Sequence, residues 1–461
     1  MGCALCGILN YLFIGLIAFI TYKIYAKLFK PLPIPKLNTK KYWGPDEEPA
    51  EGDSTEVKSF QIKASDDQLK KLKDQLSDTD FLRAPLEDSA FHNGFNADKL
   101  KKIAKYWRDE YLPKWSSQEQ FLNKFPQFIT KVQGLDIHFI HAKPIDNGKL
   151  KSKRVIPLLI LHGWPGSIRE FYEVIPKLIT PNDENDFVFE VIAPSLPGYG
   201  WSQAASKNGF GSLHYATVLR NLMLKLNFDK FLVQGGDWGS IIGNQLTTLY
   251  PENVIGYHSN MCLVSTPLSH IKLMIASWFP SKFVKEGLED FHFPILPQIK
   301  EGIRETGYFH INATKPETIG IAVGANPLGL AAYILEKFST AVHKDNRSDP
   351  EGGLDKTFTM DSLLDNLMIY YLSNAFQTSV RIYHESFKRS HTKQKIDRVK
   401  CNVPMGCVRF KNDLHAVLDW ALKDKFTNVV HSTYHRGVGH FAALENPDLF
   451  YDDFVQFVRK I

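Results

Sequence analysis

The segment Gly235-Gly236-Asp237-Trp238-Gly239 places a carboxylate among glycines, directly after the apolar run 231–234. Small residues on both sides of a reactive residue are typical of a sharp turn from strand to helix, which lifts the middle side chain into a cleft. An aspartate is ionised at neutral pH, so Asp237 could attack a carbon atom directly and form an ester. Release of that ester needs a water molecule activated by a histidine. The segment therefore predicts two-step substitution at Asp237, although taken alone it would also fit an ordinary surface turn.

A second glycine-containing turn, His162-Gly163-Trp164-Pro165-Gly166-Ser167, follows the apolar run 156–161. In hydrolases of the α/β type, such a turn supplies one backbone N–H to the oxyanion hole, and the residue after the nucleophile supplies the other. Trp164 and Trp238 are therefore the two predicted donors. A turn that only begins the next helix would explain the glycines, but not the presence of both motifs in this order.

A histidine base is expected late in the chain, after the last strand. The segment Arg436-Gly437-Val438-Gly439-His440-Phe441 provides one on a loop that contains glycines. His440 is the predicted base. His431 and His435 lie close by, but they fall within or at the end of the strand pattern 428–434 and are better explained as structural residues.

The base needs an acid that orients its imidazole and stabilises the cation, and in this fold that acid follows a late strand. Asp413 follows the strand pattern 403–410, whereas no acid lies between the strand pattern 255–261 and His270. Asp413 is therefore the predicted acid, with Asp419 and Asp424 as alternatives.

Short apolar segments alternate with helical segments from residue 155 onward, which is typical of an α/β fold with a parallel sheet. Residues 267–399 interrupt the alternation with long helical and aromatic segments. The strand patterns are 155–161, 187–193, 231–234, 255–261, 403–410 and 428–434. The sequence therefore predicts an α/β-hydrolase fold with a mainly helical lid inserted between two strands of the sheet.

The chain before residue 149 has a different pattern. Helical patterns at 66–76 and 97–111 give way to an alternating strand pattern at 135–141, which predicts a mainly helical N-terminal module. The proline-rich segment 31–35 cannot continue a helix and predicts an extended spacer. The predicted division is an anchor at 1–27, a linker at 28–50, the N-terminal module at 51–148, the α/β core at 149–266 and 400–461, and the lid at 267–399.

Residues 4–22 form an almost unbroken apolar stretch. As a helix it would span about 28 Å, close to the thickness of the hydrocarbon core of a bilayer. Lysines follow the stretch from Lys23 onward but none precedes it, and positive charge stays on the cytoplasmic side of a membrane. The stretch predicts a single transmembrane helix with the rest of the chain in the cytosol. A cleavable signal peptide is the alternative, but a basic segment before the stretch and a small-residue cleavage site are absent.

Composition narrows the possible classes of protein and the compartment in which it folds. The chain has 55 basic and 50 acidic residues, a balance that does not indicate a nucleic-acid-binding protein. Its cysteines are odd in number and scattered, which predicts free thiols, as in the reducing cytosol, rather than a disulfide framework. They are Cys3, Cys6, Cys262, Cys401 and Cys407. Two sequons, at Asn312 and Asn346, would carry glycan only in a lumenal orientation.

The chain resembles the microsomal epoxide hydrolases, and among them the insect juvenile hormone epoxide hydrolases. The resemblance covers almost the whole chain. It is carried by segments 42–45, 122–128, 162–165, 236–239, 307–311, 331–338 and 439–443. It implies an N-terminal module that packs against the hydrolase domain, and attachment to the endoplasmic reticulum membrane.

The resemblance also implies a role for two lid tyrosines, Tyr308 and Tyr383. As Asp237 opens an epoxide ring, the oxygen develops negative charge, and two phenol O–H groups can hydrogen-bond to it or protonate it. Residue types alone would not select this pair, because the lid also contains Tyr333, Tyr370 and Tyr371.

The predicted function is hydrolysis of lipophilic epoxides to vicinal diols through an ester on Asp237, without a metal or organic cofactor. The expected partners are the epoxide, water and the membrane, with no nucleic acid. Juvenile hormone is the substrate that the resemblance implies, and xenobiotic epoxides are further candidates. Similar enzymes often have glutamate as the acid, where this chain has the shorter Asp413.

Two other classes remain open at this point. A haloalkane dehalogenase also uses an aspartate at such a turn, often followed by a tryptophan. A catalytically inactive lipid-binding protein could keep the same scaffold. The products would separate the three classes: a diol from an epoxide, halide from a haloalkane, or neither.

Overall fold

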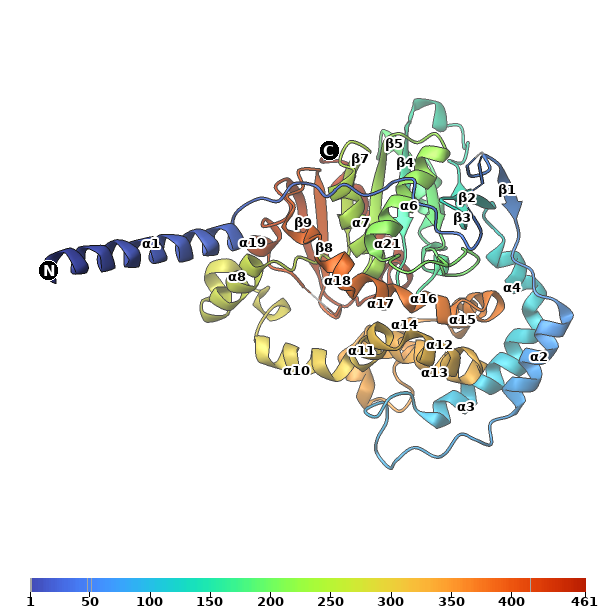
Figure 1. Ribbon diagram of the computed structural model, residues 1–461. Coiled ribbons are helices and arrows are strands. Elements are labelled where there is room, and N and C mark those ends of the chain that lie inside the picture. The colour runs from blue at the N-terminus through green and yellow to red at the C-terminus, as the bar shows by residue number, and fades with distance from the viewer. Residues whose placement is uncertain (1, 48, 51, 415) are drawn as a thin grey trace.

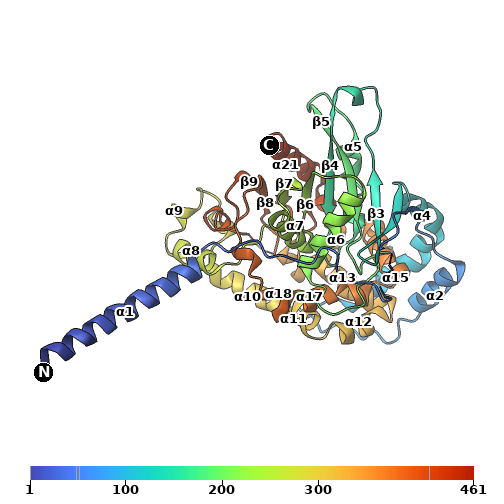
Figure 2. The same ribbon diagram turned by 45° about the horizontal axis from the view of Figure 1, so that its top comes forward.

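The computed structural model describes residues 2–47, 49–50, 52–414 and 416–461 (Figure 1). Helix α1 (Gly2–Leu28) projects from the body, and an extended segment leads from it to the first strand (Figures 1 and 2). Within the described residues, a single helix long and apolar enough to cross a membrane was not found. One bent pair, α12 (Pro316–Gly324) and α13 (Pro327–Thr340), reaches the necessary length and composition, with 116° between its helices.

A single sheet forms the centre of the molecule. In the described part of the chain it has nine strands in the order β1-β2-β3-β5-β4-β6-β7-β8-β9. Strands β5 to β9 run parallel to β4, and β1 to β3 join antiparallel beside β5. The strands are β1 (Val57–Phe60), β2 (Gln127–Val132), β3 (Leu135–Ala142), β4 (Arg154–Leu161), β5 (Phe187–Pro194), β6 (Phe231–Gly235), β7 (Val254–Ser259), β8 (Met405–Phe410) and β9 (Val429–His435). The predicted α/β fold is confirmed, and strands from the N-terminal module extend its sheet.

The central strands β4 and β6 are apolar along most of their length because both of their faces are covered. Residues 158–161 of β4 and 231–233 of β6 are completely buried. The helices of the core are α5 (Ile175–Ile179), α6 (Ser212–Lys225), α7 (Asp237–Leu249), α19 (Asp419–Leu422), α20 (Ala442–Glu445) and α21 (Pro447–Val458). Because parallel strands end on the same side, the loops after β4, β6, β8 and β9 meet at one edge of the sheet.

The lid is the helical segment between β7 and β8, and it lies against the core (Figure 1). The N-terminal module packs against two of its helices, α13 and α15 (Met360–Ser373). Its other helices are α8 (Pro267–Trp278), α9 (Pro280–Phe283), α10 (Ile295–Glu305), α11 (Gly307–Thr314), α12, α14 (Leu354–Thr357), α16 (Phe376–Ser379), α17 (Arg381–Phe387) and α18 (Arg389–Thr392). The predicted insertion of a helical lid between two strands is confirmed.

A buried polar junction joins the N-terminal module, the lid and the core. The module contributes α2 (Asp66–Ser77), α3 (Ala97–Tyr106) and α4 (Trp115–Leu122), and a π-helical turn after α3 ends at Tyr111. The Tyr111 hydroxyl donates to Asp365 Oδ1 at 2.8 Å, and Arg169 Nε donates to Asp365 Oδ2 at 2.8 Å. Asp365 lies on α15, and Arg169 lies in the turn after β4. A charge buried in this way is stable only while its partners stay in place.

The prediction of free thiols throughout the chain was wrong. Cys262 and Cys407 form a disulfide, with their Cα atoms 6.1 Å apart and a separation of 145 positions in sequence. Cys262 follows β7 and Cys407 lies in β8, which is the neighbouring strand of the sheet. The lid separates the two cysteines in sequence, so their spacing gave no indication that they meet. Cys401 is free and buried.

Replacing Asp365 by alanine is expected to lower the free energy of unfolding by about 1–3 kcal/mol, because the Tyr111 hydroxyl would be left buried without its acceptor and Arg169 would keep only Glu173 as an anionic partner. Replacing Asp183 by alanine is a matched control, since its contact with Lys149 is exposed and the change should have no measurable effect. Denaturant unfolding of the purified proteins measures both. Equal stability of the two variants would contradict a contribution of the junction to the free energy of unfolding.

Candidate active site

Asp237 lies at the turn between β6 and α7, as the glycine pattern predicts. Its φ is +48°, a left-handed conformation that is uncommon for a residue with a side chain and is found at functional sites. The turn is tight because α7 starts directly against the end of β4. A side chain at Gly239 would collide with the carbonyl oxygen of Leu161. The turn therefore requires glycine at this position, and it directs Asp237 toward the loop after β4.

The His162–Ser167 turn contacts Asp237 directly. The backbone N–H of Trp164 donates to Asp237 Oδ1 at 2.8 Å. A side chain at Gly163 would collide with the Asp237 carboxylate, so the close approach requires glycine there too. The N–H of Trp238 lies in the first turn of α7, where backbone donors have no partner within the helix and attract negative charge. The Trp164 N–H therefore contacts the Asp237 carboxyl group, while the Trp238 N–H, from the next residue of the chain, stays a predicted donor.

His162 itself holds the turn in place. Its Nδ1 is 3.0 Å from the Gly163 carbonyl oxygen, and its Nε2 accepts from the Leu196 N–H at 3.1 Å. These contacts fit a neutral imidazole that carries its proton on Nδ1. Burial lowers the pKa of His162 to about 4, which is consistent with that neutral form. His162 is therefore a structural residue of the turn.

His440 lies between two carboxylates. Its Nε2 is 3.3 Å from Asp237 Oδ2, and its Nδ1 is 2.7 Å from Asp413 Oδ1. Burial alone would lower the pKa of His440, but the carboxylates of Asp413 and Asp237 outweigh it and raise the pKa well above its usual value. In the resting protein the imidazole is therefore held as a cation between two anions.

The rival residues all have partners elsewhere. His431 and His435 both contact Asp453, at 3.1 and 3.0 Å. Among the alternative acids, Asp419 pairs with Arg409 at 2.7 Å, and Asp424 pairs with Lys272 at 2.5 Å. Neither acid therefore competes with Asp413 for the imidazole of His440.

The two lid tyrosines lie on the opposite side of the site. Tyr308 is in the first turn of α11, and its ring stacks on Trp164 with 5.2 Å between centroids. Tyr383 is in α17, and its ring meets Trp164 edge-on at 5.8 Å. Burial raises the pKa of both phenols, and the carboxylate of Asp237 raises it further. Tyr333 also touches Trp164, but its pKa is raised by burial and Glu336, with no contribution from Asp237.

Two further acids near His440 gave no signal in the sequence. Glu170 lies in the turn after β4, and Glu445 ends α20. Burial raises the pKa of Glu170 to about 8, with His440 opposing the shift and Asp237 and Glu445 adding to it. Burial also raises the pKa of Glu445 to about 7. Each glutamate belongs to a short helical turn, where an acid is usually solvated, so local pattern alone could not find them.

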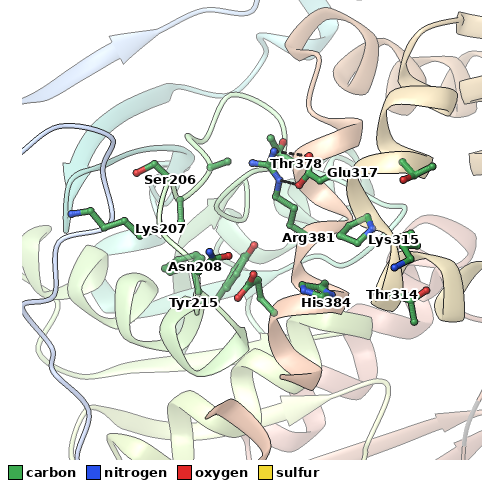
Figure 3. A pocket seen from close by; sticks show the side chains of 16 residues that line it. Ser206, Lys207, Asn208, Tyr215, Thr314, Lys315, Glu317, Thr378, Arg381 and His384 are labelled. Atoms are coloured by element: carbon green, nitrogen blue, oxygen red, sulfur yellow. Dashed lines mark hydrogen bonds and ion pairs between the residues drawn. The ribbon is translucent and has the colours of Figure 1, made fainter. Parts of the chain in front are cut away.

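Two large pockets open near the site without containing its acids or its base. One has a volume of about 490 Å³ and lies between the loop 204–210 and the lid, with an ion pair of Arg381 and Glu317 at 2.6 Å in its wall (Figure 3). The other has a volume of about 440 Å³ and is largely apolar, and Trp238 is part of its lining. In the described residues, no group of three or more His, Cys, Asp or Glu side chains is arranged to hold a metal ion.

Two family models match the chain. Residues 57–171 match the family described as "Epoxide hydrolase N terminus", and residues 156–310 match the family described as "alpha/beta hydrolase fold". The first match covers the N-terminal module and the His162–Ser167 turn, and the second covers the Asp237 turn and Tyr308.

Curated relatives and a solved structure match almost the whole chain. Juvenile hormone epoxide hydrolase 1 of Ctenocephalides felis is 45% identical over 95% of this chain and 92% of its own length. Epoxide hydrolase 1 of Oryctolagus cuniculus is 39% identical, over 91% of this chain and 92% of its own length. The crystal structure of juvenile hormone epoxide hydrolase from Bombyx mori has a TM-score of 0.89 at 39% identity, covering 92% of this chain and 98% of that one.

Replacing Glu170 by glutamine is expected to stabilise the fold increasingly as the pH rises from about 5 to about 8. In the wild type the unfolded chain ionises Glu170 above its usual pKa, whereas the folded chain holds the proton up to a pKa of about 8. The stability difference should therefore grow by up to about 1.4 kcal/mol per pH unit in favour of the variant. Denaturant unfolding at several pH values measures it, and parallel pH profiles for the two proteins would contradict the buried, protonated state.

Proposed function

The chain belongs to the epoxide hydrolase family and is an epoxide hydrolase, and we propose that it opens its substrate through an ester on Asp237 that water then hydrolyses. The observation that carries this proposal is the line from Asp237 through His440 to Asp413, with contacts of 3.3 and 2.7 Å. A nucleophile, a base and an orienting acid in mutual reach form the arrangement that such two-step catalysis requires.

In the first step, an Asp237 oxygen attacks an epoxide carbon and the bond from that carbon to the ring oxygen breaks. Tyr308 and Tyr383 donate hydrogen bonds to the departing oxygen, and one of them transfers its proton. The rival lid tyrosines have other partners, since the Tyr333 hydroxyl donates to Asn312 Oδ1 at 3.2 Å and the Tyr370 hydroxyl donates to the Gly166 carbonyl oxygen at 3.0 Å, which supports this pair. The proton held by His440 in the resting protein can then replace the one that the tyrosine lost, so the charges balance.

In the second step, His440 acts on water. Once Asp237 is an ester its negative charge is gone, and one of the two carboxylates that raise the pKa of His440 is lost. The imidazole can then be neutral and accept a proton from water as that water attacks the ester carbonyl carbon. The N–H groups of Trp164 and Trp238 stabilise the oxyanion, and its collapse releases the diol, the Asp237 carboxylate and a protonated His440.

We extend the proposal to a lipophilic substrate, with juvenile hormone as the first candidate. The Ctenocephalides felis and Bombyx mori relatives are named for that hormone. Aromatic rings of the lid surround the site, and the neighbouring pocket that contains Trp238 is largely apolar. The similarity to Epoxide hydrolase 1 of Oryctolagus cuniculus keeps other epoxides as candidates.

The proposed location is the endoplasmic reticulum membrane, with the catalytic body on the cytosolic side. Apolar side chains of α1 such as Leu12 and Phe13 are 65 and 62% exposed, and α8, which contacts α1, exposes Trp278 to 71%. Such surfaces favour lipid over water.

Asn312 and Asn346 are buried, so their sequons cannot report orientation in the folded protein. Protease protection of microsomes from cells that express the chain tests the orientation, and a protected catalytic body would contradict it.

Replacing His440 by glutamine is expected to leave ring opening largely intact and to slow ester hydrolysis by at least about 100-fold, because the general base is lost. The variant mixed with an aromatic epoxide should gain the mass of one substrate molecule, on the peptide that contains Asp237. Intact-protein and peptide mass spectrometry measure this adduct. The Asp237→Asn variant is the control and should gain no mass, and a His440→Gln variant that turns over normally would contradict the proposed base.

If juvenile hormone is the substrate, its kcat/KM should exceed that of styrene oxide by at least about tenfold, which corresponds to about 1.4 kcal/mol of transition-state binding. Steady-state turnover of both compounds by the full-length chain measures the ratio. A ratio of one or less would contradict juvenile hormone as the preferred substrate, while leaving the epoxide chemistry intact.

A further inference from the structure

The carboxylate of Glu445 binds the backbone on both sides of His440. Its Oε2 accepts from the Gly439 N–H at 2.7 Å, and its Oε1 accepts from the Phe441 N–H at 2.8 Å. The backbone N–H of Glu445 in turn donates to the Phe441 carbonyl oxygen at 2.8 Å. A single partly buried side chain therefore closes a ring around the residue that carries the imidazole.

The remaining contacts of this loop lead to the lid. The His440 N–H donates to the Ala341 carbonyl oxygen at 3.1 Å, and a side chain at Gly439 would collide with Val342. The Phe441 ring stacks on Phe338 of α13 with 3.9 Å between centroids. The loop is thus held from two sides, by Glu445 from the core and by the end of α13 from the lid. Its position fixes where the imidazole can lie between Asp237 and Asp413.

We propose that Glu445 is a positioning residue for His440, and that its carboxylate holds the imidazole in the position needed for hydrolysis of the ester on Asp237. The proposal rests on the proposed role of His440, which it deepens. A neutral glutamine cannot replace the carboxylate, because its amide group has only one acceptor oxygen and would present N–H to one of the two backbone donors. The loop would then shift, and a shift of about 1 Å in a catalytic group can cost about 100-fold in rate.

The pH dependence of hydrolysis separates a positioning role from a merely structural one. The ionised carboxylate accepts both N–H groups more strongly than the protonated acid, and burial raises the pKa of Glu445 to about 7. The ionisable groups that act on it are His440, which favours ionisation, and Asp413, which opposes it; Glu170 also lies within electrostatic range. The hydrolysis step should therefore slow as the pH falls through about 7, in addition to the decline that protonation of His440 causes, and loss of the carboxylate should leave only the His440 decline.

The test is single-turnover kinetics of Glu445→Gln with styrene oxide, following the ester on Asp237 by rapid quench and mass spectrometry. The variant is expected to form the ester within about threefold of the wild-type rate and to hydrolyse it about 10- to 100-fold more slowly. Its hydrolysis should fall less steeply with decreasing pH than that of the wild type, because only protonation of His440, and no longer protonation of Glu445, slows the step. Glu445→Asp keeps the charge but is too short to reach both donors, so it should be about as slow as Glu445→Gln if the double contact, and not the charge alone, positions the loop.

Glu119→Gln provides the matched control. Glu119 accepts from the Ala64 N–H at 2.9 Å and the Trp115 indole N–H at 3.0 Å in the N-terminal module, away from His440. The same chemical change there should leave both rate constants and the pH profile unchanged. Wild-type hydrolysis rates and an unchanged pH profile in Glu445→Gln would overturn the positioning role. Absence of any ester in the wild type and in His440→Gln would instead overturn the proposed function itself.

Discussion

One imidazole held between two buried carboxylates is the interaction on which the site depends. Asp237 follows β6, Asp413 follows β8 and His440 follows β9, so three separate loops must meet within hydrogen-bonding distance. Two anions in a buried site would repel each other strongly, and the cation between them offsets that repulsion. The same arrangement raises the pKa of His440 in the resting protein and links its protonation to the charge on Asp237. In the proposed mechanism, esterification of Asp237 therefore changes His440 from a protonated imidazole, which can donate a proton, into a neutral imidazole, which can accept one.

The fold supplies the geometry that this arrangement needs. Parallel strands bring their following loops to one edge of the sheet, and glycines at 163 and 239 let three backbone segments crowd around the Asp237 carboxylate. The lid is inserted before β8, so Tyr308, Tyr383 and Trp164 form an aromatic layer above the carboxylate. Exclusion of water by such a layer strengthens each hydrogen bond to the reacting oxygen. The Arg169–Asp365–Tyr111 junction ties the lid to the core and to the N-terminal module.

The parts of this structure that sequence could predict are those that leave a local pattern. Turns that hold Asp237 and Trp164 require small residues, and buried parallel strands require continuous apolar runs. Strand β1 was not predicted because it has only four residues, three of them exposed. The Cys262–Cys407 disulfide was missed because it depends on which strands are neighbours in the sheet. The lid separates β7 and β8 in sequence, so the sequence does not show that these strands are adjacent. Glu170 and Glu445 were missed because nothing in a short helical turn shows that its acid is buried. Tyr308 and Tyr383 came from resemblance, and the hydrogen bonds of Tyr333 to Asn312 and of Tyr370 to Gly166, which no sequence pattern shows, separate those two tyrosines from the pair.

The central claim is that an oxygen atom of Asp237 enters the product. The most direct measurement is a single turnover with enzyme in excess over epoxide, in water labelled with heavy oxygen, followed by mass spectrometry of the diol. The ester route predicts that the first diol carries only unlabelled oxygen, and that label from the solvent is found in the Asp237 carboxylate afterwards. A first diol that carries the solvent label in full would show direct attack of water on the epoxide and would contradict the account.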